Sequence, residues 1–235
     1  MSAYFITGTD TGVGKTWATL ALMKAMQNKG DAVVGMKPVA SGCKDTEDGL
    51  RNDDAVKILQ QSSKKPTQTL DYKTVNSYAF EQAVAPHIAA GLAGVKIDIE
   101  KIAADFNLLK KDSDCVLVEG IGGWCVPLGS DDMLADMVKC LDLPVILVIG
   151  LRLGCINHAL STVRAIRADG ARLYGWMANQ LDPDYAFLDE TMTTLQARIS
   201  APLLGSLPYM EKFELEILAS HIMTTECPGE NRLFD

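Results

Sequence analysis

The segment Gly8-Thr9-Asp10-Thr11-Gly12-Val13-Gly14-Lys15-Thr16 joins an apolar run at residues 4–6 to a helix-like run at residues 17–26. Glycine backbone N–H groups can approach phosphate oxygens closely, because glycine has no Cβ and adopts positive φ at little cost. The partial positive charge of a helix N-terminus favours the same ligand. In such a loop Lys15 can reach the β- and γ-phosphates, and the Thr16 hydroxyl is placed to hold Mg²⁺. The segment therefore predicts a phosphate-binding loop.

The spacing of this loop departs from the common P-loop pattern, because the spacer between Gly8 and Gly14 is one residue longer. The alternative is a Gly-rich turn whose Lys-Thr pair only opens a solvated helix. The order of strand, loop and helix favours the P-loop.

Short apolar runs recur along the chain and alternate with helical patterns. Continuous apolar runs are typical of buried parallel strands, and they occur at residues 4–6, 32–36, 115–118, 145–149, 173–178 and 203–207. Apolar residues at helical spacing occur at residues 17–27, 54–61, 99–109, 133–140, 157–168 and 187–199. Residues 62–78 are polar and aperiodic, and residues 224–235 read as an irregular tail. The alternation predicts an α/β fold: a doubly wound, mainly parallel sheet with helices on both faces, P-loop NTPase-like, in one domain over residues 1–235.

Composition narrows the class of partner. The net charge is −8 and the pI is near 4.9, which argues against nucleic acid because its phosphates would be repelled. The N-terminus runs straight into a strand and no apolar stretch approaches a membrane span, so we expect a cytoplasmic protein without a membrane partner. The six cysteines show no C-x-x-C pair, and free thiols are expected.

Ligands of such sheets lie beyond the carboxyl ends of the strands, and the second strand ends in Met36-Lys37-Pro38 before a Gly/Ser turn at Ser41 and Gly42. Proline fixes the backbone there, so Lys37 is held at the edge that faces the P-loop. A solvated strand-end charge is the ordinary alternative, and the position at the ligand edge favours a functional lysine.

The third strand runs into Glu119-Gly120. A carboxylate close to a core requires a cation, and Mg²⁺ on nucleotide phosphates is the usual one. Asp54 opens a helix, where it is either a helix cap or a second carboxylate for the same ion.

Two later strand ends carry amides. Asn157 follows the fourth strand as a plausible N-cap, where exposed N–H groups attract carboxylate or phosphate, and the neighbouring His158 is more often structural than catalytic. Asn179 ends the fifth strand, where its amide can pair with a purine edge or serve as a turn residue.

Several segments occur in a fixed order along residues 3–209: 7–11 with 13–16, 37–42, 50–52 with 54–55, 86–87, 116–120 with 122–124, 153–158, and 202–205 with Pro208. In this order they resemble the dethiobiotin synthetase family. A single P-loop is common, whereas Lys-Pro-Val-Ala-Ser-Gly at 37–42 and Leu-Gly-Cys-Ile-Asn-His at 153–158 are specific.

The resemblance implies a homodimeric ligase of biotin biosynthesis that uses ATP, Mg²⁺, CO₂ or bicarbonate, and 7,8-diaminopelargonate to make dethiobiotin, ADP and phosphate. It implies a carbamate on one amine, a carbamic-phosphoric mixed anhydride, and ring closure by the second amine. Lys37 would steady the carbamate, and Lys15 would neutralise charge as the phosphoryl group moves.

The same resemblance implies the binding residues. Thr16, Asp54 and Glu119 would hold Mg²⁺. The nucleotide would contact Thr11, Gly12, Val13, Gly14, Lys15, Thr16, Trp17, Asp54, Glu119, Gly120, Ile121, Gly122, Asn179, Gln180, Pro208, Tyr209 and Met210, with the adenine at Asn179. The substrate would contact Thr11, Lys37, Ser41 and, from the neighbouring subunit, Leu153, Gly154, Cys155, Ile156 and Asn157.

Three positions depart from the family pattern. Many members carry Glu where this chain has Gly12, and Trp is common where it has Tyr209. The family also places an acid near Leu215, and either Glu214 or Glu216 could take that place.

Other nucleotide-binding classes remain as alternatives. A P-loop GTPase switch or metallochaperone would share the fold, and residues 179–182 approximate the Asn-Lys-x-Asp guanine reader, but Gln180 replaces its lysine. A partition-type ATPase would carry an early lysine where Thr9 and Asp10 stand. An amidating ligase of cobalamin synthesis would need a glutaminase domain, for which 235 residues leave no room.

Overall fold

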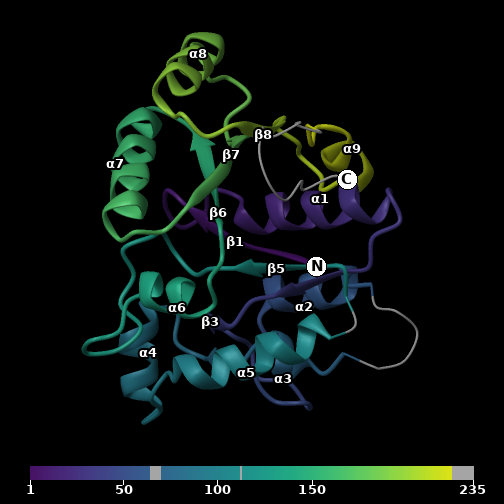
Figure 1. The fold of residues 1–235 in the computed structure, drawn as a ribbon, viewed down its shortest axis with the longest axis vertical. Helices are drawn as coiled ribbons and strands as arrows, with labels where there is room; N and C mark the ends of the chain where they lie inside the picture. Colours follow the sequence, from purple (N-terminus) through teal and green to yellow (C-terminus); the bar gives the residue numbers. More distant parts are fainter. Residues whose placement is uncertain (64–69, 112, 224–235) are drawn as a thin grey trace.

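The fold is built around a six-stranded parallel sheet in a computed structural model that describes residues 1–63, 70–111 and 113–223 (Figure 1). The strand order is β2-β5-β1-β6-β7-β8. The strands are β1 (Ser2–Gly8), β2 (Val33–Met36), β5 (Cys115–Glu119), β6 (Val145–Leu151), β7 (Leu173–Gln180) and β8 (Leu203–Leu207). All six strands predicted from apolar runs are confirmed. The predicted irregular tail, residues 224–235, lies outside the described residues.

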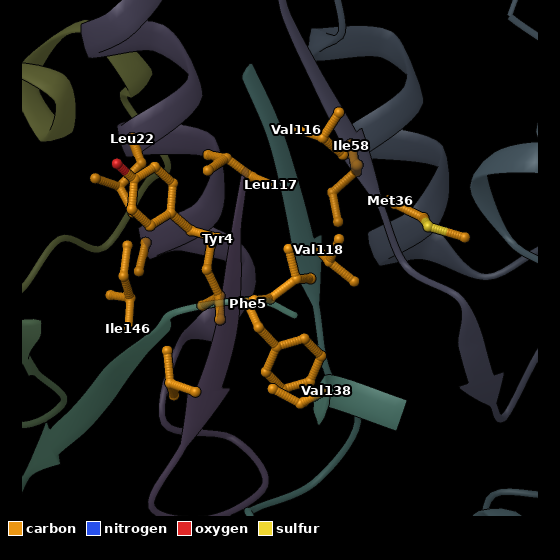
Figure 2. Packing of buried hydrophobic residues seen from close by; sticks show 14 of the residues in the cluster. Tyr4, Phe5, Leu22, Met36, Ile58, Val116, Leu117, Val118, Val138 and Ile146 are labelled. Carbon is orange, nitrogen blue, oxygen red and sulfur yellow. The ribbon is translucent and has the colours of Figure 1, made fainter. Parts of the chain in front are cut away.

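The sheet is buried on both faces, which is why its strands are apolar at successive positions. On one face Tyr4 and Ile146 lie with Leu22 of α1 (Lys15–Gln27), and on the other Phe5 points toward Val138 of α6 (Leu134–Cys140) (Figure 2). Full burial of one such side chain contributes about 1.5–3 kcal/mol. Alternate residues of one strand therefore anchor helices on opposite sides of the sheet.

A second apolar cluster extends this arrangement toward β8. Leu147 and Ile149 of β6 pack with Ala159 and Val163 of α7 (Cys155–Ala168), whereas their neighbour Val148 belongs to the cluster around α1. The predicted doubly wound sheet with helices on both faces is thus confirmed.

The helices match the predicted ones to within two residues at each end, and three short ones are additional. Besides α1, α6 and α7 they are α2 (Asp53–Gln61), α3 (Tyr72–Val75), α4 (Pro86–Leu92), α5 (Ile99–Lys110), α8 (Leu188–Arg198) and α9 (Leu215–Ser220). Helices α3 and α9, with four and six residues, are too short for a helical period to be evident in the sequence. No described helix has the length and apolarity that crossing a bilayer requires. The five described cysteines are free, as expected, and Cys227 lies outside the described residues.

A second sheet, which no apolar run in the sequence indicates, pairs β3 (Val39–Ser41) with β4 (Tyr78–Phe80) in parallel. The expectation of a Gly/Ser turn is wrong for Ser41, which is the last residue of β3. It is right for Gly42, whose φ of 72° suits glycine. A strand of three residues is below the length at which an apolar run indicates a strand.

Both outer edges of the main sheet are covered by neighbouring chain. At β2 the Ser62 hydroxyl accepts a hydrogen bond of 3.0 Å from Gly35 N–H, and Ser63 both accepts from Val33 N–H (3.2 Å) and donates its own N–H to the Val33 carbonyl (2.8 Å). At β8 the N–H of Met223 donates to the carbonyl of Leu204 at 2.8 Å.

Candidate active site

A cavity of about 700 Å³ lies at the carboxyl edge of the sheet, where β1, β2 and β5 end. Eleven of the residues that line it belong to the predicted site: Thr11, Gly12, Lys15, Thr16, Trp17, Lys37, Ser41, Asp54, Glu119, Ile121 and Gly122. Its remaining lining comes from Asn52, Lys57, the 83–86 segment before and at the start of α4, Gly123 and Val126. The structure therefore brings together residues more than 100 positions apart in the chain.

The P-loop depends on glycine at two positions. Gly14 precedes α1 with φ 86°, and a Cβ there would lie 2.1 Å from Nδ2 of Asn179. At Gly8 a Cβ would lie 2.6 Å from a methyl group of Val13. Any larger residue at either position would displace the loop.

Lys15 is buried at the start of α1 and folds back over the loop. Its ammonium donates hydrogen bonds to the carbonyls of Asp10 (3.0 Å) and Gly122 (2.5 Å). Burial, together with repulsion from the nearby Lys37 ammonium, lowers the pKa of Lys15 to about 8. Lys15 is thus a cation held on neutral carbonyls, which a phosphate oxygen can replace as the partner.

Lys37 is buried where it lines the cavity, and it forms ion pairs with the fully buried Glu119 and the partly exposed Asp54. Its ammonium is 2.6 Å from Oε1 of Glu119 and 3.6 Å from Oδ2 of Asp54. Burial alone would lower the pKa of Lys37, but attraction to Glu119 and Asp54 outweighs it, so the pKa lies above its ordinary value. Lys37 is therefore a fixed positive charge.

The backbone around Lys37 is held as the proline after it suggested. The N–H of Lys37 donates to the Val75 carbonyl at 2.8 Å, and the side chain of Asn76 donates to the Lys37 carbonyl at 2.6 Å. Asn76 is itself buried. It lies in the polar, aperiodic segment, so the sequence offered no signal for its role.

Glu119 is fully buried and accepts hydrogen bonds at both oxygens. Oε1 accepts from the Thr16 hydroxyl at 2.9 Å as well as from Lys37, and Oε2 accepts from the Thr19 hydroxyl at 2.8 Å. Three donors therefore stabilise a carboxylate that has no access to water.

Asp54 is not the cap of its helix, so one of the two alternatives for it is wrong. The cap of α2 is Asn52, whose side-chain oxygen accepts from the N–H groups of Asp54 and Ala55, both at 3.1 Å. The Asp54 carboxylate is thereby free to face the cavity and Lys37.

The side chains of Thr16, Asp54 and Glu119 fit a magnesium ion. All three supply oxygen, the ligand that Mg²⁺ prefers, and the two carboxylates share one cation already, the Lys37 ammonium. Among the described residues no group of three or more His, Cys, Asp or Glu side chains forms a metal site. Mg²⁺ does not require such a group, because it is usually bound by one or two carboxylates together with phosphates and water.

A smaller pocket of about 200 Å³ lies between the P-loop and the end of β7. It is lined by Gly12, Gly14, Trp17, Asn179, Gln180, Leu181, Tyr209 and Met210. Seven of these residues were predicted nucleotide contacts, and Leu181 is additional. Gly12 and Trp17 also line the large cavity, whereas the other five do not. Neither cavity is lined by Pro208, Val13 or Gly120. Gly120 packs so closely on Phe5 that a Cβ at Gly120 would lie 2.7 Å from the Phe5 ring.

The acid that the family places near Leu215 is not in this pocket. Glu216 is exposed and forms an ion pair of 2.7 Å with Lys24, and Glu214 is the exposed residue that precedes α9. Neither lines a described cavity.

The 153–157 segment does not reach the cavity of its own chain. The predicted N-cap at Asn157 is wrong: α7 begins at Cys155 after Gly154, whose φ is 90°, so Asn157 lies inside the first turn. Leu153 is 92% exposed, and the preceding Arg152 forms an ion pair of 2.8 Å with Asp10 of the P-loop.

This fold and this site define a P-loop nucleotide-binding protein. A family model described as an AAA domain matches residues 2–216. Among solved structures, the MinD cell division protein of Aquifex aeolicus is similar with a TM-score of 0.53 and 16% identity, covering 94% of this chain and 88% of that one. A ParA family ATPase of Chlorobium tepidum is similar with a TM-score of 0.52 and 13% identity, covering 94% and 90%. At such identities the likeness shows the fold alone.

The sequence relatives are closer. A protein of Xanthomonas campestris named ATP-dependent dethiobiotin synthetase BioD is 44% identical over 220 residues, which are 94% of this chain and 96% of the relative. One of the same name from Xylella fastidiosa is 45% identical over 210 residues, which are 89% and 91%. The chain belongs to the ATP-dependent dethiobiotin synthetase family.

Proposed function

We propose that this protein is an ATP-dependent dethiobiotin synthetase, which closes the ureido ring of dethiobiotin from 7,8-diaminopelargonate and CO₂ while ATP becomes ADP and phosphate. The observation that carries the proposal is the convergence of the P-loop, the buried Lys37 and Ser41 on one cavity of about 700 Å³. A cavity of this size accommodates a triphosphate end beside a small organic substrate.

In the first step one substrate amine attacks the carbon of CO₂, a nitrogen–carbon bond forms while one C=O π bond opens onto its oxygen, and the nitrogen loses a proton to water to give an anionic carbamate. Lys37 stays protonated, because the cluster around it raises its pKa, and so it attracts the carbamate oxygens. The buried Ser41 hydroxyl has no hydrogen-bond partner among the described residues, which suits a group that binds substrate. Thr11 lies at the same cavity.

In the second step a carbamate oxygen attacks the γ-phosphorus, the bond to the β-γ bridging oxygen breaks, and ADP leaves. Lys15 exchanges its carbonyl partners for the migrating phosphoryl oxygens and neutralises their charge. Thr16, Asp54 and Glu119 would hold Mg²⁺, which would supply charge neutralisation at the phosphates. The second amine then attacks the carbamoyl carbon and forms a nitrogen–carbon bond, the carbon–oxygen bond to phosphate breaks, and the amine proton leaves with the phosphate, which closes the ring.

The pocket of about 200 Å³ suits the base of the nucleotide. The amide oxygen of Asn179 can accept from an exocyclic amine, and Trp17 and Tyr209 supply apolar walls. This supports ATP as the co-substrate.

The substrate also carries a carboxylate far from its two amines, and we assign it to residues 153–157 of a neighbouring subunit in a homodimer. Two observations support this: the segment stays outside its own cavity, and Leu153 is almost fully exposed. The start of α7, a helix of 14 residues, offers N–H groups to a carboxylate. Nothing in this scheme needs a membrane or nucleic acid, and we propose that it operates in the cytoplasm.

The test is the substrate dependence of phosphate release. Purified protein with Mg²⁺ and ATP should release phosphate only when diamine and bicarbonate are both present, and mass spectrometry should then detect dethiobiotin in equal amount. Steady release without diamine would indicate a P-loop switch or metallochaperone instead. A Lys15→Ala sample controls for contaminating hydrolysis.

A further inference from the structure

The hydroxyl of Thr19 lies in the second turn of α1, fully buried, and has two acceptors within reach. Oε2 of Glu119 is 2.8 Å away, and the carbonyl of Lys15 is 2.9 Å away. A hydroxyl carries one proton, so it donates to one acceptor at a time. A threonine inside a helix usually donates to the carbonyl four residues earlier. Here the carboxylate is the stronger acceptor because it is charged and buried.

The bond to Thr19 fixes the orientation of Glu119. Lys37 and Thr16 both donate to Oε1, and Thr19 is the one described donor to Oε2. Without it, Oε2 would be a buried carboxylate oxygen with no described partner, and the carboxylate would turn to find another donor. Such a rotation would carry Oε1 away from Lys37 and Thr16, both of which line the cavity.

We propose that Thr19 is a positioning residue, which holds the Glu119 carboxylate so that one oxygen faces the cation site. The inference rests on the proposed role of Glu119 in holding Mg²⁺. Groups that hydrogen-bond to a metal ligand typically change metal affinity about 10- to 100-fold when they are removed.

The experiment compares Thr19→Val, which keeps the branched shape without the hydroxyl, with Thr19→Ser, which keeps the hydroxyl. ADP binding is measured by calorimetry in EDTA and over a series of Mg²⁺ concentrations, with no diamine present. We expect Thr19→Val to shift the Mg²⁺ midpoint upward about tenfold, with ADP affinity in EDTA unchanged, and Thr19→Ser to behave as the wild type. Thr191→Val removes another buried hydroxyl, one that contacts Tyr185 at 2.9 Å, and serves as the matched control.

The effect should also require the charge of Glu119. In a Glu119→Gln background, adding Thr19→Val should change the Mg²⁺ midpoint no further. A wild-type midpoint in Thr19→Val, an equal loss in Thr19→Ser, or an additive effect in the double variant would each overturn the proposal.

Should Thr19→Val not fold, a comparison of Thr19→Ala with Thr19→Ser measures the effect of the same hydroxyl on the Mg²⁺ midpoint. If the ADP affinity of the wild type did not depend on the Mg²⁺ concentration, the metal role of Glu119 would be overturned as well. The formation of dethiobiotin would still test the proposed reaction separately.

Discussion

The side-chain amide of Asn179 donates a hydrogen bond of 3.0 Å to the carbonyl of Val13, which joins the end of β7 to the P-loop. Asn179 is buried, and the same amide would collide with a side chain at Gly14. The pocket assigned to the base and the loop assigned to the phosphates are therefore connected, and a substitution in either should alter the geometry of both.

Gly14→Ala should weaken ATP binding more than Gly12→Ala does. Both positions have positive φ, which costs an L-residue about 1–2 kcal/mol. Only at Gly14 does the new Cβ also meet Asn179, at 2.1 Å, whereas nothing lies within 4 Å of a Cβ at Gly12. Calorimetry with ATP, and urea unfolding to separate affinity from stability, would measure the difference. Equal affinities for the two variants would contradict the role given to the close approach.

Lys37→Ala should abolish ring closure before ATP is involved. Its loss leaves Glu119 buried without a charge partner, and breaking such a pair costs about 3–5 kcal/mol of stability. Isotope trapping of labelled CO₂ as carbamate should fall to background. Lys15→Ala is the comparison: it should still trap carbamate, while turnover falls by about a hundredfold or more. If the folded Lys37→Ala variant trapped as much carbamate as the wild type, the role assigned to Lys37 would be wrong.

Glu119→Gln should raise the Mg²⁺ concentration that nucleotide use requires, because the amide keeps the shape and loses the charge. Circular-dichroism melting checks that the fold survives. Since Glu119 also holds Lys37, trapping of carbamate should weaken in the same variant. If the variant binds Mg·ADP as the wild type does and a higher Mg²⁺ concentration restores no activity, Glu119 is not a metal ligand.

Two inactive variants should regain activity when they form a mixed dimer. Lys37→Ala damages the cavity of its own chain, and Asn157→Asp places a negative charge in the first turn of α7, where the substrate carboxylate would bind. If each subunit lends this segment to the other, a mixed dimer has one doubly damaged site and one intact site, and about half of wild-type activity returns.

The control is each variant carried alone through the same unfolding, refolding and two-tag purification. Mixed dimers as inactive as their parents would place the whole site within one chain.

Thiol labelling of the native protein should distinguish exposed from buried cysteines. Cys125 and Cys140 are exposed, and Cys43, Cys115 and Cys155 are buried. Burial raises the pKa of Cys115 to about 12, so its thiolate is scarce at pH 8 and should appear only on unfolding. Cys125→Ser and Cys140→Ser should each remove one fast-reacting equivalent. Fast labelling of Cys115 would show that the start of β5 opens readily.

The strands and the central site were predictable because one rule governs both. Buried parallel strands are apolar throughout, so a charged residue that ends one is conspicuous, and Lys37 and Glu119 end neighbouring strands of the sheet. Parallel strands bring their carboxyl ends to one edge, so the sequence alone predicts that the two residues lie near Thr16.

Local choices between competing caps were not predictable. Asn52 and Asp54 are both good caps, and the chain uses Asn52. Asn157 is a better cap by type than Gly154, but a turn with positive φ places the glycine there. Thr19 gave no signal, because a threonine inside a helix is ordinary until its distant partner, Glu119, is known.

The serines along β2 and the backbone pairing along β8 have a consequence for how copies of this chain can meet. An exposed strand edge is a template on which a second chain can add its own strand, and from there aggregates grow. Here the outward N–H groups of Val33 and Gly35 are occupied by Ser63 and Ser62, and the outward carbonyl of Leu204 by Met223. An added strand would have to displace these contacts at either edge of the main sheet, so colloidal stability at high concentration should depend on keeping the short covering segments in place.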